Sequence, residues 1–374
     1  MKLLHISDLH IGKKVKGFSL LEDQKYILEQ IAETLKEKEV DGLIIAGDIY
    51  DVSSPSNDAI CLFDKFITTV HSMGVSCYVV SGNHDSVYRV AFCSDIMAKE
   101  NVHFAKRYEG EILPIEADKN INIWLLPFIR PTDVREYHSD FATGSYDEMM
   151  RTVIKHLDID TKKTNILVAH QFITNAGKPP EKSESEIVSL GTLDNIDVSV
   201  FDDFDYVALG HIHKPQIMGR DTVRYSGSPL KYSFSEKDDK KAMVLIEITS
   251  NKKIKQELIP FKPLRDMQEY VGTFDKLSKY PSTIEDFVRI VIKDELQIID
   301  VKHKLENRFK NIMEIIYDNA STKENKTIES AIRIKTQTPF DLFNQFYEQQ
   351  NNQPLNDEQV QIVKKILTEM EETV

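Results

Sequence analysis

Five short segments of the chain place histidine, aspartate and asparagine side chains in a pattern suited to holding metal ions. Their donors include no cysteine, and a mixture of carboxylate, amide and imidazole ligands favours Mn²⁺, Fe²⁺ or Zn²⁺ over a structural zinc site built from thiolates. The donors outnumber what one ion with open positions needs, so the pattern indicates two ions that share a bridging carboxylate. The segments are Asp8-Leu9-His10, Gly47-Asp48-Ile49-Tyr50-Asp51, Gly82-Asn83-His84-Asp85, His170 and Gly210-His211-Ile212-His213.

Two metal ions held side by side would suit the hydrolysis of a phosphodiester. A pair about 3.5–4 Å apart stabilises both the attacking and the leaving oxygen, which gain charge during an in-line displacement. One segment alone is weak evidence, because an isolated Asp-x-His pair is usually a polar detail and Gly-Asn-His is an ordinary turn. The five segments together, in this order, predict a binuclear metal site.

Each segment directly follows a short apolar run that is typical of a buried strand. Longer stretches with apolar residues at helical spacing, Glu22–Lys38 and Asp58–Ser72, separate some of these runs. Strands that alternate with helices predict an α/β fold, and ligands of open α/β sheets bind beyond the carboxyl ends of the strands. We therefore expect all five segments at one sheet edge. The runs are Leu3–Ile6, Leu43–Ala46, Val75–Val80, Ile166–Ala169 and Tyr206–Leu209.

Later features of the sequence set the expected domain boundaries. Thr222–Ser226 and Ala242–Ile248 have no helix between them and predict a hairpin-like addition that makes the sheet mixed. Pro260 and Pro263 suit a linker, so residues 1–260 form the first expected domain. Residues 261–335 are expected to form a small α+β domain. Its predicted elements are a strand at Phe287–Ile292, a helix at Ile299–Phe309 and a strand at Ile312–Tyr317.

Residues 336–374 are expected to form a pair of amphipathic helices. The first follows the capping signature Thr338-Pro339-Phe340-Asp341, and the second starts after Asn356. Two short helices have little core of their own, so they either pack on the small domain or dock on a partner protein. Their apolar positions are Phe340, Phe343 and Tyr347 on the first helix and Val360, Val363, Leu367 and Met370 on the second.

The composition is that of an ordinary globular protein. The 374 residues are 41% hydrophobic and 29% charged, which excludes collagen-like and fully disordered chains. No apolar stretch reaches the ~18 residues of a membrane helix and the N-terminus lacks a signal-peptide core, so we expect a cytoplasmic protein with no membrane contact. The net charge of −13 disfavours non-specific nucleic-acid binding by the whole chain but allows a local basic patch. Cys61, Cys77 and Cys93 are expected to be reduced core residues.

The order of the five segments resembles the calcineurin-like metallophosphoesterase superfamily over roughly residues 1–250. Further segments resemble its DNA nucleases, which are related to those that process double-strand breaks. This resemblance implies a mixed-sheet sandwich flanked by helices, a small capping domain that recognises DNA, and a C-terminal helical segment that docks a partner. The further segments are Leu21–Gln24, Ser183–Glu186, Phe204–His211, Tyr225–Leu230 and Ser233–Glu236.

The resemblance also implies a role for each donor. The first ion would lie on Asp8, His10, Asp48 and His213, and the second on Asp48, Asn83, His170 and His211, with Asp48 as the bridge. His84 would contact the scissile phosphate or protonate the leaving 3′-oxygen. Asp85 would either orient His84 or cap the following helix, and the role of Asp51 stays open, with support of a ligand as one interpretation. The remaining histidines, expected to be structural or on the surface, are His5, His71, His103, His138, His156 and His303.

The resemblance implies a Mn²⁺-dependent nuclease with 3′→5′ exonuclease activity on duplex ends and endonuclease activity on single strands and hairpins. It would act near the nucleoid in DNA repair, recombination and replication, as a homodimer within a heterotetramer that holds two copies of an SMC-like ATPase. Cations next to the metal segments are expected to contact the DNA backbone, with a solvated surface loop as the alternative interpretation. These cations are Lys13, Lys14, Lys16, Arg89 and Lys214.

Two other functions stay open on the sequence alone. The first is a phosphatase or cyclic-nucleotide phosphodiesterase that uses the same metal site. The second domain and the terminal helices argue against it, because small phosphatases need neither. The second is a non-catalytic scaffold that bridges DNA ends, and the complete set of metal donors argues against it.

Overall fold

The computed structural model describes most of the chain, with gaps at 140, 142–143, 187–194 and 250 and over most residues after 319. Two compact units emerge, one made of Met1–Glu269, Ser282–Arg289 and Phe309–Glu314, the other of Tyr270–Pro281, Ile290–Arg308 and Ile315–Val374. The described residues are 1–139, 141, 144–186, 195–249, 251–319, 343–344, 347, 355–356 and 359–363.

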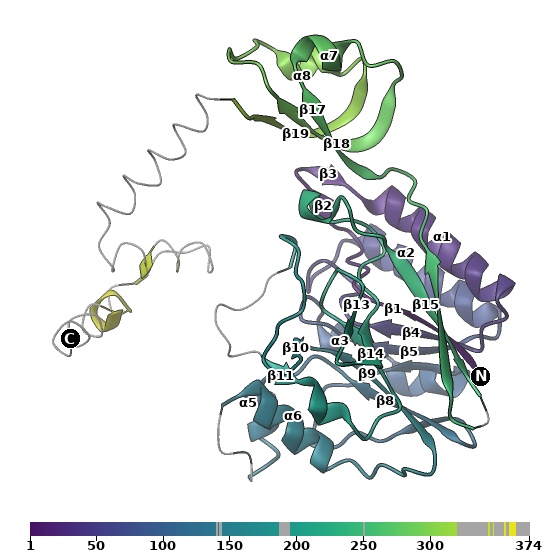
Figure 1. The fold of residues 1–374 in the computed structure, drawn as a ribbon. Coiled ribbons are helices and arrows are strands. Elements are labelled where there is room, and N and C mark those ends of the chain that lie inside the picture. The colour runs from purple at the N-terminus through teal and green to yellow at the C-terminus, as the bar shows by residue number, and fades with distance from the viewer. Residues whose placement is uncertain are drawn as a thin grey trace. The chain divides into compact units, whose positions relative to one another are not determined.

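A six-stranded sheet in the first unit combines N-terminal strands with two strands from residues 242–260 (Figure 1). β1, β4, β5 and β6 run parallel, whereas β15 pairs antiparallel with β1 and β16 antiparallel with β15. Parallel strands buried on both faces read as continuous apolar runs, which is why these segments stand out in the sequence. The strand order is β16 (Ile254–Pro260), β15 (Ala242–Ile248), β1 (Lys2–Ile6), β4 (Gly42–Ala46), β5 (Ser76–Val80) and β6 (Val102–Phe104).

Two long helices cover the outer face of this sheet. In α1 (Leu21–Glu37), the predicted apolar positions Ile27, Ile31 and Leu35 are all buried. In α2 (Asn57–Ser72), Ser56 caps the first turn by accepting a hydrogen bond from the Ala59 N–H. The shorter elements along this half of the chain are β2 (Lys14–Val15), β3 (Phe18–Ser19), α3 (Val87–Val90), α4 (Ser94–Met97) and η1 (Ala98–Glu100).

A second six-stranded sheet packs against the first. β8, β9, β12 and β14 run parallel, and the edge strands β7 and β13 are antiparallel to their neighbours. α5 (Pro131–Arg135) and α6 (Tyr146–Lys155) contribute to the apolar cluster on its outer face. The strand order is β13 (Gln216–Met218), β14 (Arg220–Tyr225), β12 (Tyr206–Gly210), β9 (Thr164–His170), β8 (Ile121–Leu126) and β7 (Ile115–Asp118).

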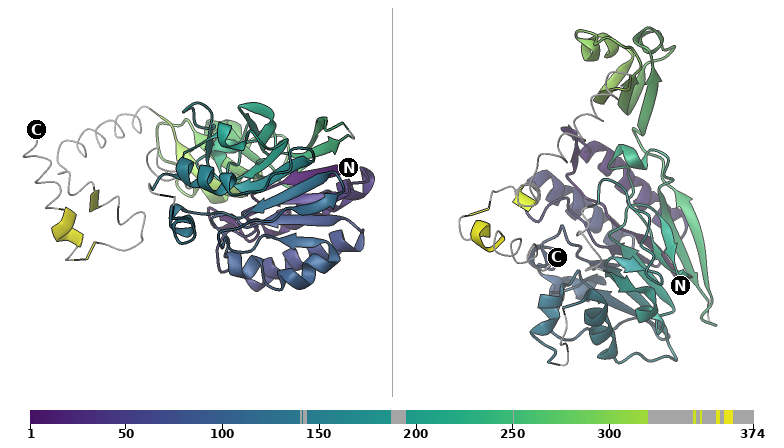
Figure 2. Two further views of the ribbon diagram at one scale, coloured as in Figure 1. Left: turned by 90° about the horizontal axis from the view of Figure 1, so that it is seen from below. Right: turned by 60° about the vertical axis from the view of Figure 1, so that its left-hand side comes forward.

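The core between the two sheets is mostly apolar, with the buried His5 ring bonded to the Tyr206 hydroxyl inside it. Ile44 and Val80 from the first sheet lie in one buried cluster with Val168 and Ala208 from the second. The left view of Figure 2 shows helices on both outer sides of the paired sheets. The expected mixed-sheet sandwich flanked by helices is therefore confirmed.

Two details of the predicted sheet arrangement are wrong. The alternation of strands and helices predicted one central sheet, but the strands divide between two sheets. The predicted hairpin of Thr222–Ser226 with Ala242–Ile248 does not form, because β14 belongs to the second sheet and β15 to the first. Each strand instead makes a hairpin with its own neighbour, β13 with β14 and β15 with β16. Apolar content shows that a strand is buried, but not which sheet buries it.

A separate three-stranded sheet contains β17 (Met267–Gly272), β18 (Ile284–Ile292) and β19 (Phe309–Tyr317) in that order. The Phe287 N–H bonds to the Asp266 carbonyl and the Lys293 N–H to the Gly272 carbonyl, a constant offset that marks β17 and β18 as parallel. The predicted strand–helix–strand pattern is present, with a shorter helix at α8 (Val301–Leu305) and an additional α7 (Phe274–Ser278).

The predicted linker at Pro260 and Pro263 falls at the end of a strand. Pro260 ends β16, and Phe261 and Met267 are buried in the core under α1. The first unit continues to Glu269. Two prolines close together therefore mark the end of a strand here, because proline is tolerated at the margin of a sheet.

The C-terminal predictions fall mostly outside the described residues, as do Phe340, Leu367 and Met370. Phe343 is helical and 40% exposed, and Tyr347, Val360 and Val363 are half-buried. Asn356 and Gln359 bond reciprocally, side chain to backbone N–H at 2.9 and 3.0 Å, so the predicted helix start after Asn356 is confirmed.

The cysteine prediction holds in part. All three thiols are free, and Cys77 is buried, but Cys61 and Cys93 are exposed. Within the part of the chain that the structure describes, no helix combines the length and apolar character that crossing a membrane requires.

Candidate metal centre

The predicted metal-binding segments converge at strand ends of both large sheets. Asp8, Asp48 and Asn83 follow β1, β4 and β5 of the first sheet, while His170 ends β9 and His211 follows β12 of the second. The expectation of a single sheet edge is corrected accordingly. The site draws on two sheets whose strands end side by side, and three sets of closely spaced potential ligand atoms occur there. They are Asp8 with His10 and His213, His10 with Asp48 and His84, and Asp8 with Asp48 and His170.

Left-handed backbone positions turn the ligand side chains back toward the sheet ends. Asp8, His10 and Asp48 have φ angles of 53°, 44° and 49°, although none of them is glycine. Such conformations cost free energy and persist at functional sites only where the surrounding structure holds them. Here the Asp8 N–H bonds to the Gly47 carbonyl and the His10 N–H to the Asp48 carbonyl, so the two turns support each other.

His10 and His213 face each other across the first half of the site. Their Nε2 atoms lie 3.1 Å apart, and Asp48 Oδ2 lies 3.5 Å from His10 Nε2. All three side chains are buried. Two ring nitrogens at this distance need either a proton or a cation between them, and Asp8 joins them in one set of potential metal-ligand atoms. The residues present therefore fit a divalent ion.

The second half of the site gathers around Asn83. Its Oδ1 lies 3.1 Å from His170 Nε2 and 2.9 Å from His211 Nδ1. His170 Nδ1 donates to the Ala46 carbonyl at 2.8 Å, which directs Nε2 toward Asp48 Oδ2 at 3.3 Å. Asp48 thus lies between the two halves, in the position expected of a bridging ligand.

Glycines at the strand ends make room for these contacts. Gly47 has a φ of +86°, and a Cβ there would overlap His170 Nδ1. A Cβ on Gly82 would overlap Asp48 Oδ1, and one on Gly210 would overlap the Ala46 carbonyl. The three glycines are therefore needed for close approach of backbone to ligand.

The buried Asp48 carboxylate favours a positive charge beside it in the site. Burial by itself lowers the pKa of His170, but the Asp48 carboxylate outweighs burial and the pKa rises to about 9. Burial raises the pKa of Asp48, yet His170 and His10 hold it well below its usual range. Desolvation, and then the neighbouring His170, lower the pKa of His211 to about 3.

His84 lies at the rim of the site, and its ring is held by the backbone. Its Nδ1 donates to the Asp51 carbonyl at 2.8 Å, and its N–H donates to Asp48 Oδ1 at 2.9 Å. In this arrangement the Asp51 carbonyl, and not the Asp85 carboxylate, orients the His84 ring. The Asp85 carboxylate instead accepts three backbone N–H groups, from Ile49, Tyr50 and Gly82, at 2.9–3.0 Å.

Asp85 therefore ties the turn after β4 to the turn after β5. Burial, with the Asp48 carboxylate nearby, raises its pKa to about 6. Asp51 supports a candidate ligand, because its Oδ1 lies 3.4 Å from His10 Nδ1 and 2.6 Å from Lys13 Nζ. His10 Nδ1 makes no hydrogen bond among the described residues, so Asp51 acts on this ring through its charge.

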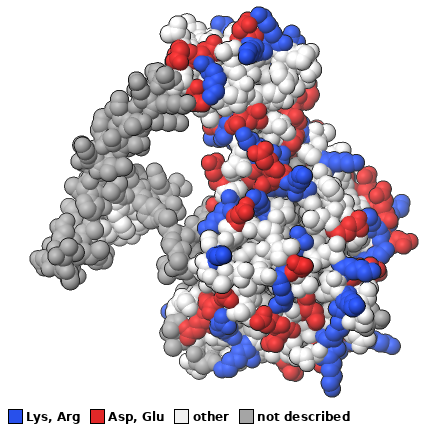
Figure 3. All heavy atoms as spheres, viewed as in Figure 1, with Lys and Arg blue, Asp and Glu red and all other residues white. Residues whose placement is uncertain are grey.

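The lysine and arginine side chains expected to contact DNA differ in whether they are paired with a carboxylate. Lys13 is paired with Asp51, Lys16 with Glu314 at 3.0 Å, and Lys214 with Glu181. Lys14 and Arg89 are exposed. On the face seen in Figure 3, basic and acidic side chains are interspersed, with no broad basic patch among the coloured residues.

His213 is surrounded by further side chains to which the sequence analysis gave no role. Ser185 Oγ lies 2.7 Å from His213 Nδ1, and Glu186 accepts the His213 N–H at 2.6 Å. Glu236 and Lys241 complete the cluster beneath them. The segments Ser183–Glu186 and Ser233–Glu236 are part of the resemblance described above, but nothing in their spacing indicates that they meet at a histidine.

Comparisons with known proteins identify the family of the chain. Residues 1–215 match the calcineurin-like phosphoesterases, and residues 260–351 match SbcD_C, described as the type 5 capsule protein repressor C-terminal domain. The chain is 30% identical over 377 residues to the SbcD component of the nuclease SbcCD from Staphylococcus epidermidis (strain ATCC 12228 / FDA PCI 1200), with 98% of each covered.

Two solved structures are also similar. One is a dimetal phosphatase from Danio rerio, at 12% identity and a TM-score of 0.40, covering 70% of this chain and 99% of that one. The other is the phosphoesterase Yfce from E. coli, at 13% identity and a TM-score of 0.28, covering 69% of this chain and 100% of that one.

The fold and the donor set together define a metallophosphoesterase, so the expected superfamily is confirmed. The chain belongs to the calcineurin-like phosphoesterases and, within them, to the SbcD family of nuclease subunits.

Proposed function

We propose that the chain is the metal-dependent DNA nuclease subunit of an SbcCD-type complex, hydrolysing phosphodiester bonds. The convergence of buried histidine and aspartate donors, with half-buried Asn83 beside them, at the ends of both sheets carries this proposal. Support comes from the similarity to a protein named as a nuclease subunit, because that similarity extends over 98% of the chain and therefore includes the second unit.

The proposed ligands follow the two halves of the site. Asp8, His10, Asp48 and His213 hold one ion, and Asp48, Asn83, His170 and His211 hold the other. Two divalent ions there would lower the pKa of water toward neutrality and offset charge on the phosphate. A donor set of oxygen and imidazole nitrogen suits Mn²⁺, which we propose as the working metal.

We propose that His84 acts on the substrate and not on the metal. Its bond to the Asp51 carbonyl requires a proton on Nδ1, so Nε2 is the nitrogen left to meet the phosphate or the leaving oxygen. The rim position and half-buried ring leave it accessible. Asp85 supports the turn that carries His84 through the three backbone bonds described above.

DNA contacts are proposed for Lys14 and Arg89 first, because both are exposed. Lys13, Lys16 and Lys214 would have to exchange a carboxylate partner for a phosphate. Contacts of this kind would give affinity without sequence preference and a strong dependence on salt.

We propose that the chain forms a homodimer through an apolar patch near α2, α3 and α4. Ile60 is 43% exposed, Phe92 74% and Ile96 66%, and the three line one pocket. Large apolar side chains gathered on a surface are typical of an interface. Phe92→Glu should convert a dimer to a monomer in sedimentation, without loss of secondary structure. A wild-type monomer at micromolar concentration would contradict this proposal.

The partner ATPase is proposed to bind the C-terminal helices, in a heterotetramer with two copies of each subunit. Phe343 and Ile362, at 40% and 59% exposed, are available for such a contact. Work on DNA would place the complex in the cytoplasm at the nucleoid.

One experiment tests the nuclease against the phosphatase. Purified chain with Mn²⁺ is given labelled hairpin DNA and, separately, a small phosphomonoester. We expect cleavage of the hairpin, inhibition by EDTA and loss of cleavage in Asp48→Asn, which keeps the shape of the bridging side chain but removes its charge. Hydrolysis of the phosphomonoester alone would favour the phosphatase.

A further inference from the structure

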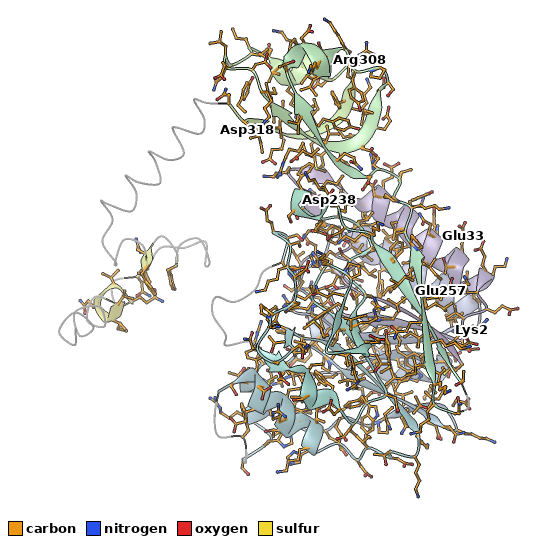
Figure 4. All side chains as sticks on the ribbon, in the orientation of Figure 1. Lys2, Glu33, Asp238, Glu257, Arg308 and Asp318 are labelled. Atoms are coloured by element: carbon orange, nitrogen blue, oxygen red, sulfur yellow. The ribbon has the colours of Figure 1, made fainter. Side chains whose placement is uncertain are left out.

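A buried cluster beneath His213 joins two segments that are far apart in the sequence. Ser185 Oγ lies 2.7 Å from His213 Nδ1 and 2.5 Å from Glu236 Oε1, and Lys241 Nζ lies 2.6 Å from Glu236 Oε2. Glu236 is fully buried and Lys241 nearly so. Glu236 ends η3 (Phe234–Glu236), and the chain continues to Asp238, which is labelled in Figure 4.

The charges of this cluster decide where each proton lies. Glu236 is paired with the Lys241 ammonium, so its carboxylate can only accept hydrogen bonds. The Ser185 hydroxyl must therefore donate to Glu236, which leaves a Ser185 lone pair for His213. It follows that His213 Nδ1 carries the proton and donates to Ser185 Oγ.

A proton on Nδ1 determines what the other ring nitrogen of His213 can bind. With the proton on Nδ1, the lone pair of His213 lies on Nε2, which faces His10 Nε2 at 3.1 Å. The backbone of His213 is held by the same cluster, because Lys241 Nζ donates to its carbonyl at 2.8 Å and Glu186 accepts its N–H at 2.6 Å.

We infer that Ser185 and Glu236 are positioning residues that hold His213 in the Nδ1-protonated form, with Nε2 ready to bind a metal ion. The inference deepens the proposed function and rests on the same site. Ser185 directs its own hydroxyl proton to Glu236, which is buried and paired with Lys241, and therefore accepts a hydrogen bond from the His213 ring. Partners of this type behind a metal-binding histidine are worth about 10–100-fold in metal affinity.

The test uses the full chain and three serine variants. Ser185→Ala removes the hydroxyl, and Ser185→Thr keeps a hydroxyl at the same place. Ser235→Ala is the matched control, since Ser235 Oγ accepts the Glu184 N–H at 2.9 Å and so joins the same two segments without touching His213.

The first readout needs no metal. In metal-free protein labelled with ¹⁵N-histidine, the His213 ring, assigned with His213→Asn, should show a protonated Nδ1 in wild type and in Ser185→Thr. Ser185→Ala should give a mixture of both neutral forms. Calorimetric titration with Mn²⁺ should then show affinity reduced by about 10–100-fold in Ser185→Ala and restored in Ser185→Thr.

Two outcomes would overturn the inference. One is an unchanged ring spectrum in Ser185→Ala, and the other is a loss of affinity no greater than that in Ser235→Ala. Wild-type protein that binds no Mn²⁺ would contradict the proposed metal centre instead, whereas the ring spectrum of the metal-free protein still decides the role of Ser185.

Discussion

At the scale of single residues, the candidate metal-binding histidines differ from His84 in the hydrogen bonds that hold their rings. His170 and His213 each have one ring nitrogen bound to the protein behind it and the other facing the site. His84 is held by the Asp51 carbonyl at the rim. Metal-binding histidines typically show the first arrangement, because the bond at the back fixes the ring and its proton.

Replacing His84 should impair turnover but not metal binding. We expect His84→Gln to keep two Mn²⁺ per chain by elemental analysis, because the ring lies outside the proposed ligand set. Cleavage of hairpin DNA should fall by roughly 10²–10⁴-fold, the usual effect of losing a proton donor or acceptor. A variant that loses metal would instead move His84 among the ligands.

His5 should make the protein sensitive to acid. Burial first, and then the Arg224 guanidinium, lower its pKa from 6.5 to about 3. Between these values the unfolded chain binds the proton and the folded chain does not, so stability is present above pH 6.5 and falls as the pH drops toward 3.

We therefore expect His5→Leu to flatten this fall. Urea unfolding in EDTA at pH 7, 6 and 5 should show the wild-type free energy of unfolding dropping faster than that of the variant, by at most about 1.4 kcal/mol per pH unit. Parallel curves would mean that His5 takes up its proton equally in both states.

At the scale of elements, the site depends on how sharply the strands end. β4 passes at Gly47 into a left-handed turn that leads to Asp48. A side chain at Gly47 would overlap the His170 ring, which comes from the other sheet. The turn after one strand therefore sets the distance between the two sheets at the metal centre.

Gly47→Ala should displace the His170 ring of the second sheet from the turn after β4 of the first. Gly74→Ala is a matched control, because Gly74 has a φ of +75° but open space where a Cβ would lie. Both variants should lose about 1–2 kcal/mol of stability from the left-handed backbone. Only Gly47→Ala should also lose bound Mn²⁺, measured by calorimetric titration. Full metal binding in Gly47→Ala would show that His170 can shift without harm.

At the scale of the whole molecule, the proposed metal centre and the proposed partner-binding helices lie in separate parts of the chain. All proposed metal ligands belong to the first compact unit, whereas residues 315–374 belong to the second. Such a division allows one function to be removed while the other is kept.

Truncation after Lys335 should remove partner binding alone. We expect a folded, Mn²⁺-dependent nuclease that cleaves single-stranded DNA but no longer co-purifies with its ATPase. Phe343→Glu in the full chain should weaken the same complex, because burying an unpaired carboxylate is costly. Aggregation of the truncated protein would assign the helices to this chain's own core, and undiminished binding would place the dock elsewhere.

The sequence by itself identified the candidate donors and the strands that precede them. Asp8, Asp48 and Asn83 follow apolar runs long enough to be strands, and that local pattern survives in the fold because buried parallel strands must be apolar throughout. The helical spacing of Ile27, Ile31 and Leu35 likewise identifies the buried face of α1.

Only the tertiary structure decided which elements meet. The division of strands between two sheets, the place of β14 and β15, and the cluster of Ser185, Glu236 and Lys241 under His213 all depend on contacts between residues distant in the chain. Apolar periodicity records that a residue is buried, whereas a partner is chosen by packing and by hydrogen bonds that form only once the sheets have assembled. The bond that fixes the proton on His213 is of that second kind.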